Sequence, residues 1–124
     1  MGERVETFSS GTIRRLREGA AWVVAMHGDH DLSTAPDLVR ELHQAFDADA
    51  PLVVDLSEVD FMDSAILNAL LTARERALAR HEGSFALVAP PGSFPSRVLA
   101  LVVGTLIPTY PGLADAVAAV APSE

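Results

Sequence analysis

A serine hydroxyl directly after a carboxylate is the feature of this sequence best suited to chemistry. Ser64 follows Asp63 at the start of a segment whose apolar residues recur at helical spacing. The first turn of a helix has backbone N–H groups without intrahelical partners and the positive end of the helix dipole, so it can receive a phosphate group. Ser64 is therefore a candidate phosphorylation site and indicates a regulatory protein rather than an enzyme.

The same pair has a simpler structural interpretation, because Asp and Ser are both favoured as helix caps worth about 1 kcal/mol. A phosphate would add a charge of about −1.5 to −2 beside three acidic residues, Glu58, Asp60 and Asp63. Within the domain the helix dipole offsets part of this repulsion, whereas a docked partner meets new desolvation and like-charge costs. The modification could thus preserve the fold and abolish binding.

Two other kinds of site are weighed against this one. A serine hydrolase elbow, G-x-S-x-G, would need glycines where Met62 and Ile66 stand; a Ser-His-Asp constellation stays open, but so small a domain does not favour it. Asp55 follows an apolar run like the phosphoaspartate of receiver domains, yet that chemistry needs a lysine and the chain has none. We expect Asp55 to bond to loop amides.

The segment Gly28–Thr34 combines carboxylates, an imidazole and hydroxyls. Its composition alone favours a polar strand-to-helix connection. Asp29, His30 and Asp31 are metal-ligating types, but three adjacent residues rarely converge on one ion and no spaced partners accompany them. We therefore predict neither a metal site nor a catalytic site.

Composition restricts the classes of function. The chain has 124 residues, 49% of them hydrophobic, which suits one domain with a single core. It has no cysteine, and its nine basic residues are all arginine, so thiol, disulfide, Schiff-base and P-loop lysine chemistry are excluded. A net charge of −8 opposes direct binding to nucleic acid. Without a signal-peptide core or a membrane-length apolar run, we expect a cytoplasmic protein.

Alternating strand and helix patterns predict an α/β domain with a mixed, largely parallel sheet of about four to five strands and about four helices. The predicted strands are Thr12–Leu16, Ala20–His27, Leu52–Leu56, Phe85–Ala89 and, at an edge, Ile107–Tyr110. Predicted helices run from Ser33 or Thr34 through Phe46, from Ser64 to Arg80 with Gly83 as the stop, from Ser93 or Ser96 through Val103, and from Leu113 to Val120.

Three of these expectations concern details. Gly28–Asp31 should end the second strand. The helix from Ser64 should bury one apolar face, made of Ile66, Leu67, Leu70, Leu71, Ala77 and Leu78. The single domain should span 1–124, with 1–10 as an N-terminal extension and 121–124 as a tail.

Three segments together resemble the STAS domain family, specifically its anti-sigma factor antagonists. They are Gly28–Ala35, Leu52–Leu56 and Phe61–Ser64. The family carries G-E-[LVI]-D…T-A and M-D-S-[ST]-G-[LIV] at comparable separation, so Met62-Asp63-Ser64 is the most specific match. Arg97–Leu106 also resembles the family's R-[VL]-[LF]-x-x-x-G-L helix end, and Tyr110–Val117 its closing strand and helix, so the resemblance spans nearly the whole chain.

The resemblance implies a STAS-like fold and a partner-switching role. In the family, the unphosphorylated antagonist binds an anti-sigma factor that is also a serine kinase, which releases the sigma factor. The kinase uses ATP to phosphorylate the antagonist and so ends binding, and a serine phosphatase resets the cycle. Carried over, Ser64 matches the acceptor, Asp63 its preceding carboxylate, and Asp31 the aspartate of the nearby G-E-x-D loop. The chain itself then needs no cofactor.

The predicted partner-binding residues come from two segments: Asp29, His30, Asp31, Ser33, Thr34, Asp63, Ser64, Ala65 and Ile66. Two positions depart from the family pattern, since Ala65-Ile66 replaces [ST]-G and His30 stands where an apolar residue is usual. The alternative interpretation is a non-phosphorylated STAS scaffold or sensor that binds a small ligand or another regulatory protein.

Overall fold

The computed structural model describes every residue except 1–3, 8–10, 49, 81–83, 103–105 and 122–124. The strands are β1 (Arg4–Thr7), β2 (Gly11–Glu18), β3 (Ala21–His30), β4 (Leu52–Met62), β5 (Phe85–Val88) and β6 (Thr109–Tyr110). The helices are α1 (Ala35–Asp47), α2 (Ser64–Arg80), α3 (Phe94–Val102) and α4 (Leu113–Val120).

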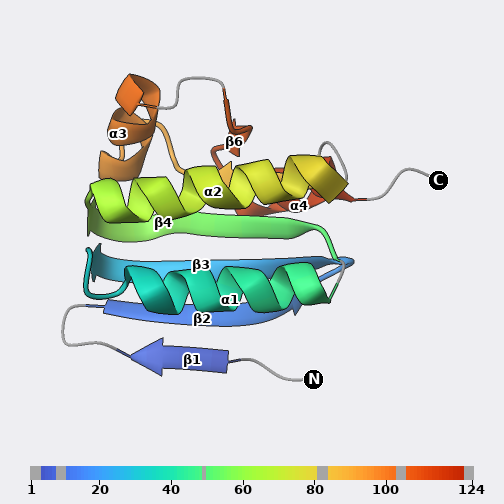
Figure 1. Cartoon of the computed structure of the whole chain (residues 1–124). Coiled ribbons are helices and arrows are strands. Elements are labelled where there is room, and N and C mark those ends of the chain that lie inside the picture. Colours follow the sequence, from blue (N-terminus) through green and yellow to red (C-terminus); the bar gives the residue numbers. More distant parts are fainter. Residues whose placement is uncertain (1–3, 8–10, 49, 81–83, 103–105, 122–124) are drawn as a thin grey trace.

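One mixed sheet holds the strands in sequence order, β1-β2-β3-β4-β5-β6 (Figure 1). The pairs β1–β2 and β2–β3 are antiparallel, and the pairs from β3 through β6 are parallel. The predicted α/β class, with a mixed, largely parallel sheet and four helices, is confirmed, and the sheet has one further strand at its edge. The additional strand is β1, whose backbone pairs with β2 although its residues were assigned to an extension.

Two apolar cores lie on opposite faces of the sheet. Alternating strand residues face opposite ways, so Val24 and Val54 pack with α1 and α2, while Val23 and Val53 pack against α4. The inner strand β3 is therefore covered on both faces, as its apolar run predicts. This layering brings α1 and α2 side by side on one face (Figure 1).

Both central strands are longer than predicted. The expected break at Gly28–Asp31 is wrong, because β3 continues to His30 with Gly28 at φ 87° and register shifts against β4 on either side. A bulge of this kind inserts residues without ending the strand. β4 likewise continues to Met62, so Asp63 alone separates this strand from α2.

A glycine on β2 allows the end of β3 to pack closely. Gly11 pairs with Gly28, and a Cβ atom on Gly11 would lie 2.3 Å from the carbonyl oxygen of His27 and 2.9 Å from Nε2 of His30. Real Cβ atoms do not approach that closely, so only glycine fits without a shift of the backbone. The lack of a side chain on Gly11 therefore allows the end of β3 to pack closely against β2.

The helices largely match their patterns. The predicted bounds of α2 and α4 are confirmed, while α3 begins at Phe94 and its predicted last residue, Val103, lies outside the described residues, as does Gly83. Leu78 is 44% exposed, so its predicted burial is wrong. β5 ends one residue early, and only Thr109–Tyr110 of the last predicted strand pairs.

Candidate functional site

Ser64 is the first residue of α2, and its side chain is exposed to solvent. It lies at the carboxyl end of β4, at the same end of the sheet as the turn between β3 and α1 (Figure 1). Parallel strands such as β3 and β4 bring their carboxyl ends together, so both polar segments of the sequence meet at this edge. The hydroxyl is thus accessible at a helix start.

Asp63 is the side-chain cap of α2. Its Oδ1 accepts hydrogen bonds from the backbone N–H of Ala65 at 3.0 Å and of Ile66 at 3.3 Å. Its Oδ2 accepts a third hydrogen bond, at 3.2 Å, from the backbone N–H of Leu32 in the turn before α1. One carboxylate therefore satisfies two amides at the start of α2 and fixes the neighbouring turn.

Asp31 organises that turn from within. Its Oδ1 accepts hydrogen bonds from the backbone N–H of Ser33 at 2.9 Å and from the Ser33 hydroxyl at 2.6 Å. These two bonds favour the ionised carboxylate and hold the pKa of Asp31 below its ordinary value. The backbone oxygen of Asp31 also accepts from the N–H groups of Thr34 and Ala35, both at 3.0 Å.

His30 is fully buried, with no exposed surface. Its Nδ1 lies 3.2 Å from Oγ1 of Thr34, and its Nε2 lies 3.0 Å from the carbonyl oxygen of His27. Burial penalises the charged imidazolium and so lowers the pKa of His30, against smaller opposing effects of backbone carbonyls and of Asp29 and Asp31. Both ring nitrogens of this buried side chain therefore lie within hydrogen-bond distance of a polar atom.

The predicted partner-binding residues fall into two groups. The side chains that reach solvent, fully or partly, are those of Asp29, Asp31, Ser33, Asp63, Ser64 and Ala65. The side chains of His30, Thr34 and Ile66 are buried and shape the site from below. Ile66 replaces the family glycine, but its β-branched side chain points into the core and leaves the approach to Ser64 open.

Sequence reasoning missed the apolar residues beside these polar groups. Leu32 is 73% exposed, although it lies within the polar turn. Phe61 on β4 is 43% exposed, and its ring centroid lies 5.6 Å from that of Phe94 on α3. An apolar residue in an otherwise polar loop was the available signal for Leu32, whereas the pairing of Phe61 with Phe94 depends on tertiary structure.

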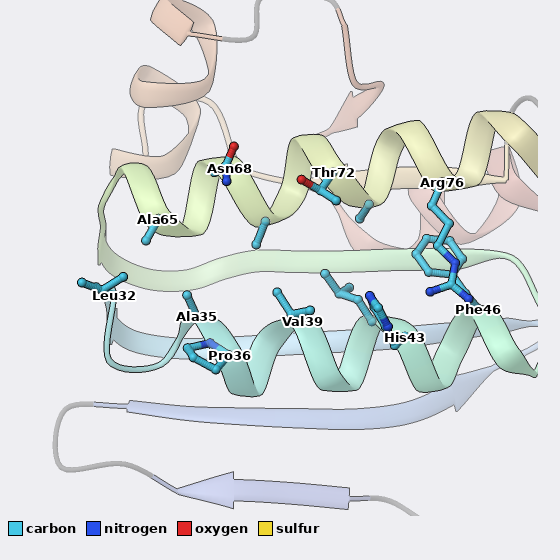
Figure 2. Close-up of a pocket in the computed structure, with 13 residues that line it drawn as sticks. Leu32, Ala35, Pro36, Val39, His43, Phe46, Ala65, Asn68, Thr72 and Arg76 are labelled. Carbon is cyan, nitrogen blue, oxygen red and sulfur yellow. The ribbon is translucent and has the colours of Figure 1, made fainter.

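A groove of about 460 Å³ lies between α1 and α2, and Figure 2 shows its lining. The lining residues are Leu32, Ala35, Pro36, Val39, Leu42, His43, Phe46, Ala65, Asn68, Ala69, Thr72, Ala73 and Arg76. Leu32 and Ala65 form its end nearest Ser64, so the groove is continuous with the surface that carries the serine.

The Asp55 carboxylate accepts a hydrogen bond from the backbone N–H of Ser57 at 2.9 Å, within β4 rather than in a loop. Over the described ranges, no group of three His, Asp or Glu side chains could hold a metal ion. None of the helices in the described part of the chain is long and apolar enough to cross a membrane.

Comparisons with known proteins agree with this geometry. A family model described as "Mlab, STAS domain" matches residues 13–107. An anti-sigma factor antagonist from Mycobacterium paratuberculosis is similar in structure at a TM-score of 0.78 and 28% identity, over 93% of this chain and 97% of that one.

Two further structures are similar at lower identity. A putative anti-sigma factor antagonist from Thermotoga maritima has a TM-score of 0.69 at 18% identity, over 86% of this chain and 92% of that one. The unphosphorylated anti-sigma factor antagonist SpoIIAA has a TM-score of 0.55 at 14% identity, with 92% of each chain covered. These two likenesses concern the fold alone.

Proposed function

The chain belongs to the STAS domain family, and from this we propose that it is an anti-sigma factor antagonist switched off by phosphorylation of Ser64. In this proposal the unphosphorylated chain binds a kinase-type anti-sigma factor, and a serine phosphatase restores the bound state. The chain acts in the cytoplasm as a regulator of transcription, without enzymatic activity or cofactor of its own. The observation that carries the proposal is the exposed hydroxyl of Ser64 at the first position of α2.

The hydrogen bonds of Asp63 explain how a phosphate could act on a partner rather than on the fold. The N–H groups of Ala65 and Ile66 already donate to the Asp63 carboxylate. A phosphate on Ser64 is therefore not drawn into the helix start, and its charge faces outward. There it adds to the charges of Asp31 and Asp63, so a partner surface that accommodates a neutral hydroxyl meets an anionic cluster.

The residues around Ser64 also support a protein-binding surface. Exposed apolar side chains of Leu32 and Phe61 lie among the charged residues of the two segments. Apolar anchors within a polar rim are typical of protein–protein interfaces. We therefore include Leu32 and Phe61 in the docking surface and assign His30, Thr34 and Ile66 the task of supporting it.

The test uses the full chain, ATP and the anti-sigma factor of the same genome that carries a kinase-type ATPase domain. Mass spectrometry should find one phosphate on the peptide containing Ser64, and Ser64→Ala should abolish it. Ser33→Ala is the matched control, because Ser33 is a second exposed hydroxyl on this surface. Phosphate on any other residue, unaffected by Ser64→Ala, would refute the assigned acceptor.

The second candidate is a non-phosphorylated scaffold or sensor, which the groove between α1 and α2 favours. In that case wild type and Ser64→Glu should bind the same partner equally, as measured by isothermal titration calorimetry. A loss of binding in Ser64→Glu, with Ala79→Glu unaffected, supports the phosphorylation switch instead, because Ala79 is exposed near the opposite end of α2.

A further inference from the structure

The groove between α1 and α2 differs between its two ends (Figure 2). Leu32, Pro36 and Ala65 line the end nearest Ser64 and are apolar. At the other end lie His43 and Arg76, and the Arg76 guanidinium lies 5.1 Å from the centre of the Phe46 ring. The groove thus joins an apolar trough to a cationic end.

Two rows of side chains on α2 create this trough. Ala65, Ala69 and Ala73 are spaced four residues apart, so they form a continuous row of small side chains toward α1. Thr72 and Arg76 belong to a second, polar row that borders the first. Because the alanine side chains are small, they leave space between α1 and α2 for the groove. The polar side chains of the second row lie along one edge of the groove.

The charge of the lining contrasts with that of the whole chain. The protein has 17 acidic and nine basic residues, a net charge of −8. No acidic side chain is among the thirteen residues that line the groove within the described structure, whereas His43 and Arg76 are. An anion repelled by most of this surface therefore meets a complementary charge at one end of the groove.

The dimensions suit a small elongated ligand. A volume of about 460 Å³ lies within the range of about 300–1,000 Å³ that small-molecule sites occupy. The eleven helical steps from Ala65 to Arg76 correspond to about 16 Å along α2. An extended chain advances about 1.2 Å per bond, so roughly a dozen carbon atoms span this length.

We propose that this groove binds a medium-chain aliphatic carboxylate. The hydrocarbon chain lies over the alanine row, and the carboxylate lies at the end formed by His43 and Arg76. The Arg76 fork can donate two parallel hydrogen bonds to a carboxylate. Arg76 also makes other interactions in the structure. On binding, the carboxylate of the ligand replaces some of these interactions.

Nuclear magnetic resonance of the nitrogen-15-labelled full chain tests the proposal, with sodium decanoate titrated below its micelle concentration. Saturable shifts should be confined to amides of α1, α2 and the turn at Leu32. Decanol should bind at least about fivefold more weakly, because it lacks the charge that pairs with Arg76 at a partly exposed site. Decyltrimethylammonium, which has the same chain and the opposite charge, should bind more weakly still.

Two pairs of variants separate the trough from its cationic end. Thr72→Trp places an indole over the groove and should abolish decanoate binding, whereas Leu78→Trp adds the same group elsewhere on α2 and should not. Arg76→Gln should weaken decanoate about fivefold but leave decanol unchanged. Arg97→Gln removes an equal charge on α3 and should change neither. Circular dichroism verifies that each variant is folded.

Three results would overturn the proposal. One is non-saturating shifts centred on the exposed Leu101 and Val102 of α3, which indicate adsorption. The second is an equal effect of Arg76→Gln and Arg97→Gln, which indicates general charge attraction. The third is that the wild type does not bind decanoate and that Thr72→Trp changes the oligomeric state. This result indicates that the groove is a contact between protein chains. Ser64→Ala should bind decanoate like wild type, so this result is independent of the phosphorylation switch.

Discussion

The backbone N–H of Leu32 donates a hydrogen bond to Oδ2 of Asp63 across 31 positions of sequence. The other oxygen of the same carboxylate caps α2 through Ala65 and Ile66. The turn before α1 and the start of α2 are therefore parts of one hydrogen-bonded unit. Ser64 is the next residue after Asp63, whose carboxylate joins the two segments. A modification of Ser64 therefore occurs beside the group that holds both segments in place.

Removing the Asp63 carboxylate should destabilise the protein. Asp63→Ala loses a helix cap and the bond to Leu32, so we expect the free energy of unfolding to fall by about 1–2 kcal/mol in urea titrations. Asp60→Ala, at an exposed position of β4, should change it by less than about 0.5 kcal/mol. Equal effects of the two substitutions would show that the capping bonds contribute little.

Substitution of Ser64 should separate binding from stability. The side chain is exposed and makes no core contact, so Ser64→Ala and Ser64→Glu should each change the free energy of unfolding by less than about 0.5 kcal/mol. Under the proposed function, Ser64→Glu alone should weaken binding to the anti-sigma factor by tenfold or more, since about 1.4 kcal/mol of charge repulsion suffices. Calorimetric titration measures the binding, and urea unfolding measures the stability.

His30 should make stability depend on pH on the acidic side of neutrality. Burial keeps its pKa in the folded protein below the ordinary value of about 6.5, so the unfolded chain takes up the proton first as pH falls. Stability is thus highest above about pH 6.5 and falls below it until the folded-state pKa is reached. His30→Leu should flatten this decline in urea titrations at a series of pH values, and an unchanged decline would contradict the assignment to His30.

Restoring the family glycine at position 66 should be costly. Ile66 has no exposed surface, so Ile66→Gly removes a core side chain and introduces a flexible residue into α2. We expect a loss of about 3–5 kcal/mol, compared with about 1 kcal/mol for Ile66→Val. Thermal unfolding followed by circular dichroism checks both values. Similar melting temperatures for the two variants would contradict the buried placement of Ile66.

A glycine pair provides a test of the close packing under β3. Gly11→Ala forces a Cβ atom against His27 and His30, so we expect a loss of about 1–3 kcal/mol. Gly112→Ala is the matched control, because no atom lies within 4 Å of a Cβ placed there and its φ of −138° suits any residue. Urea unfolding of both variants should show a clear difference in midpoint.

Local patterns in the sequence determined the elements and the position of Ser64. The bounds of α2 and α4 and the placement of Ser64 at a helix start follow from apolar periodicity and from capping residues, which act over a few neighbouring positions. The Met62-Asp63-Ser64 triplet indicated the family because it is a short segment that can be recognised from neighbouring residues alone.

Only the tertiary structure decided which of the residues in the turn before α1 reach solvent. His30 is buried and Leu32 is exposed because β3 continues past Gly28 and packs beside β4, a pairing that no local pattern contains. The bond between Leu32 and Asp63, and the groove between α1 and α2, likewise join segments far apart in the sequence. Burial and contact depend on the neighbours that the fold supplies, and periodicity describes each element alone.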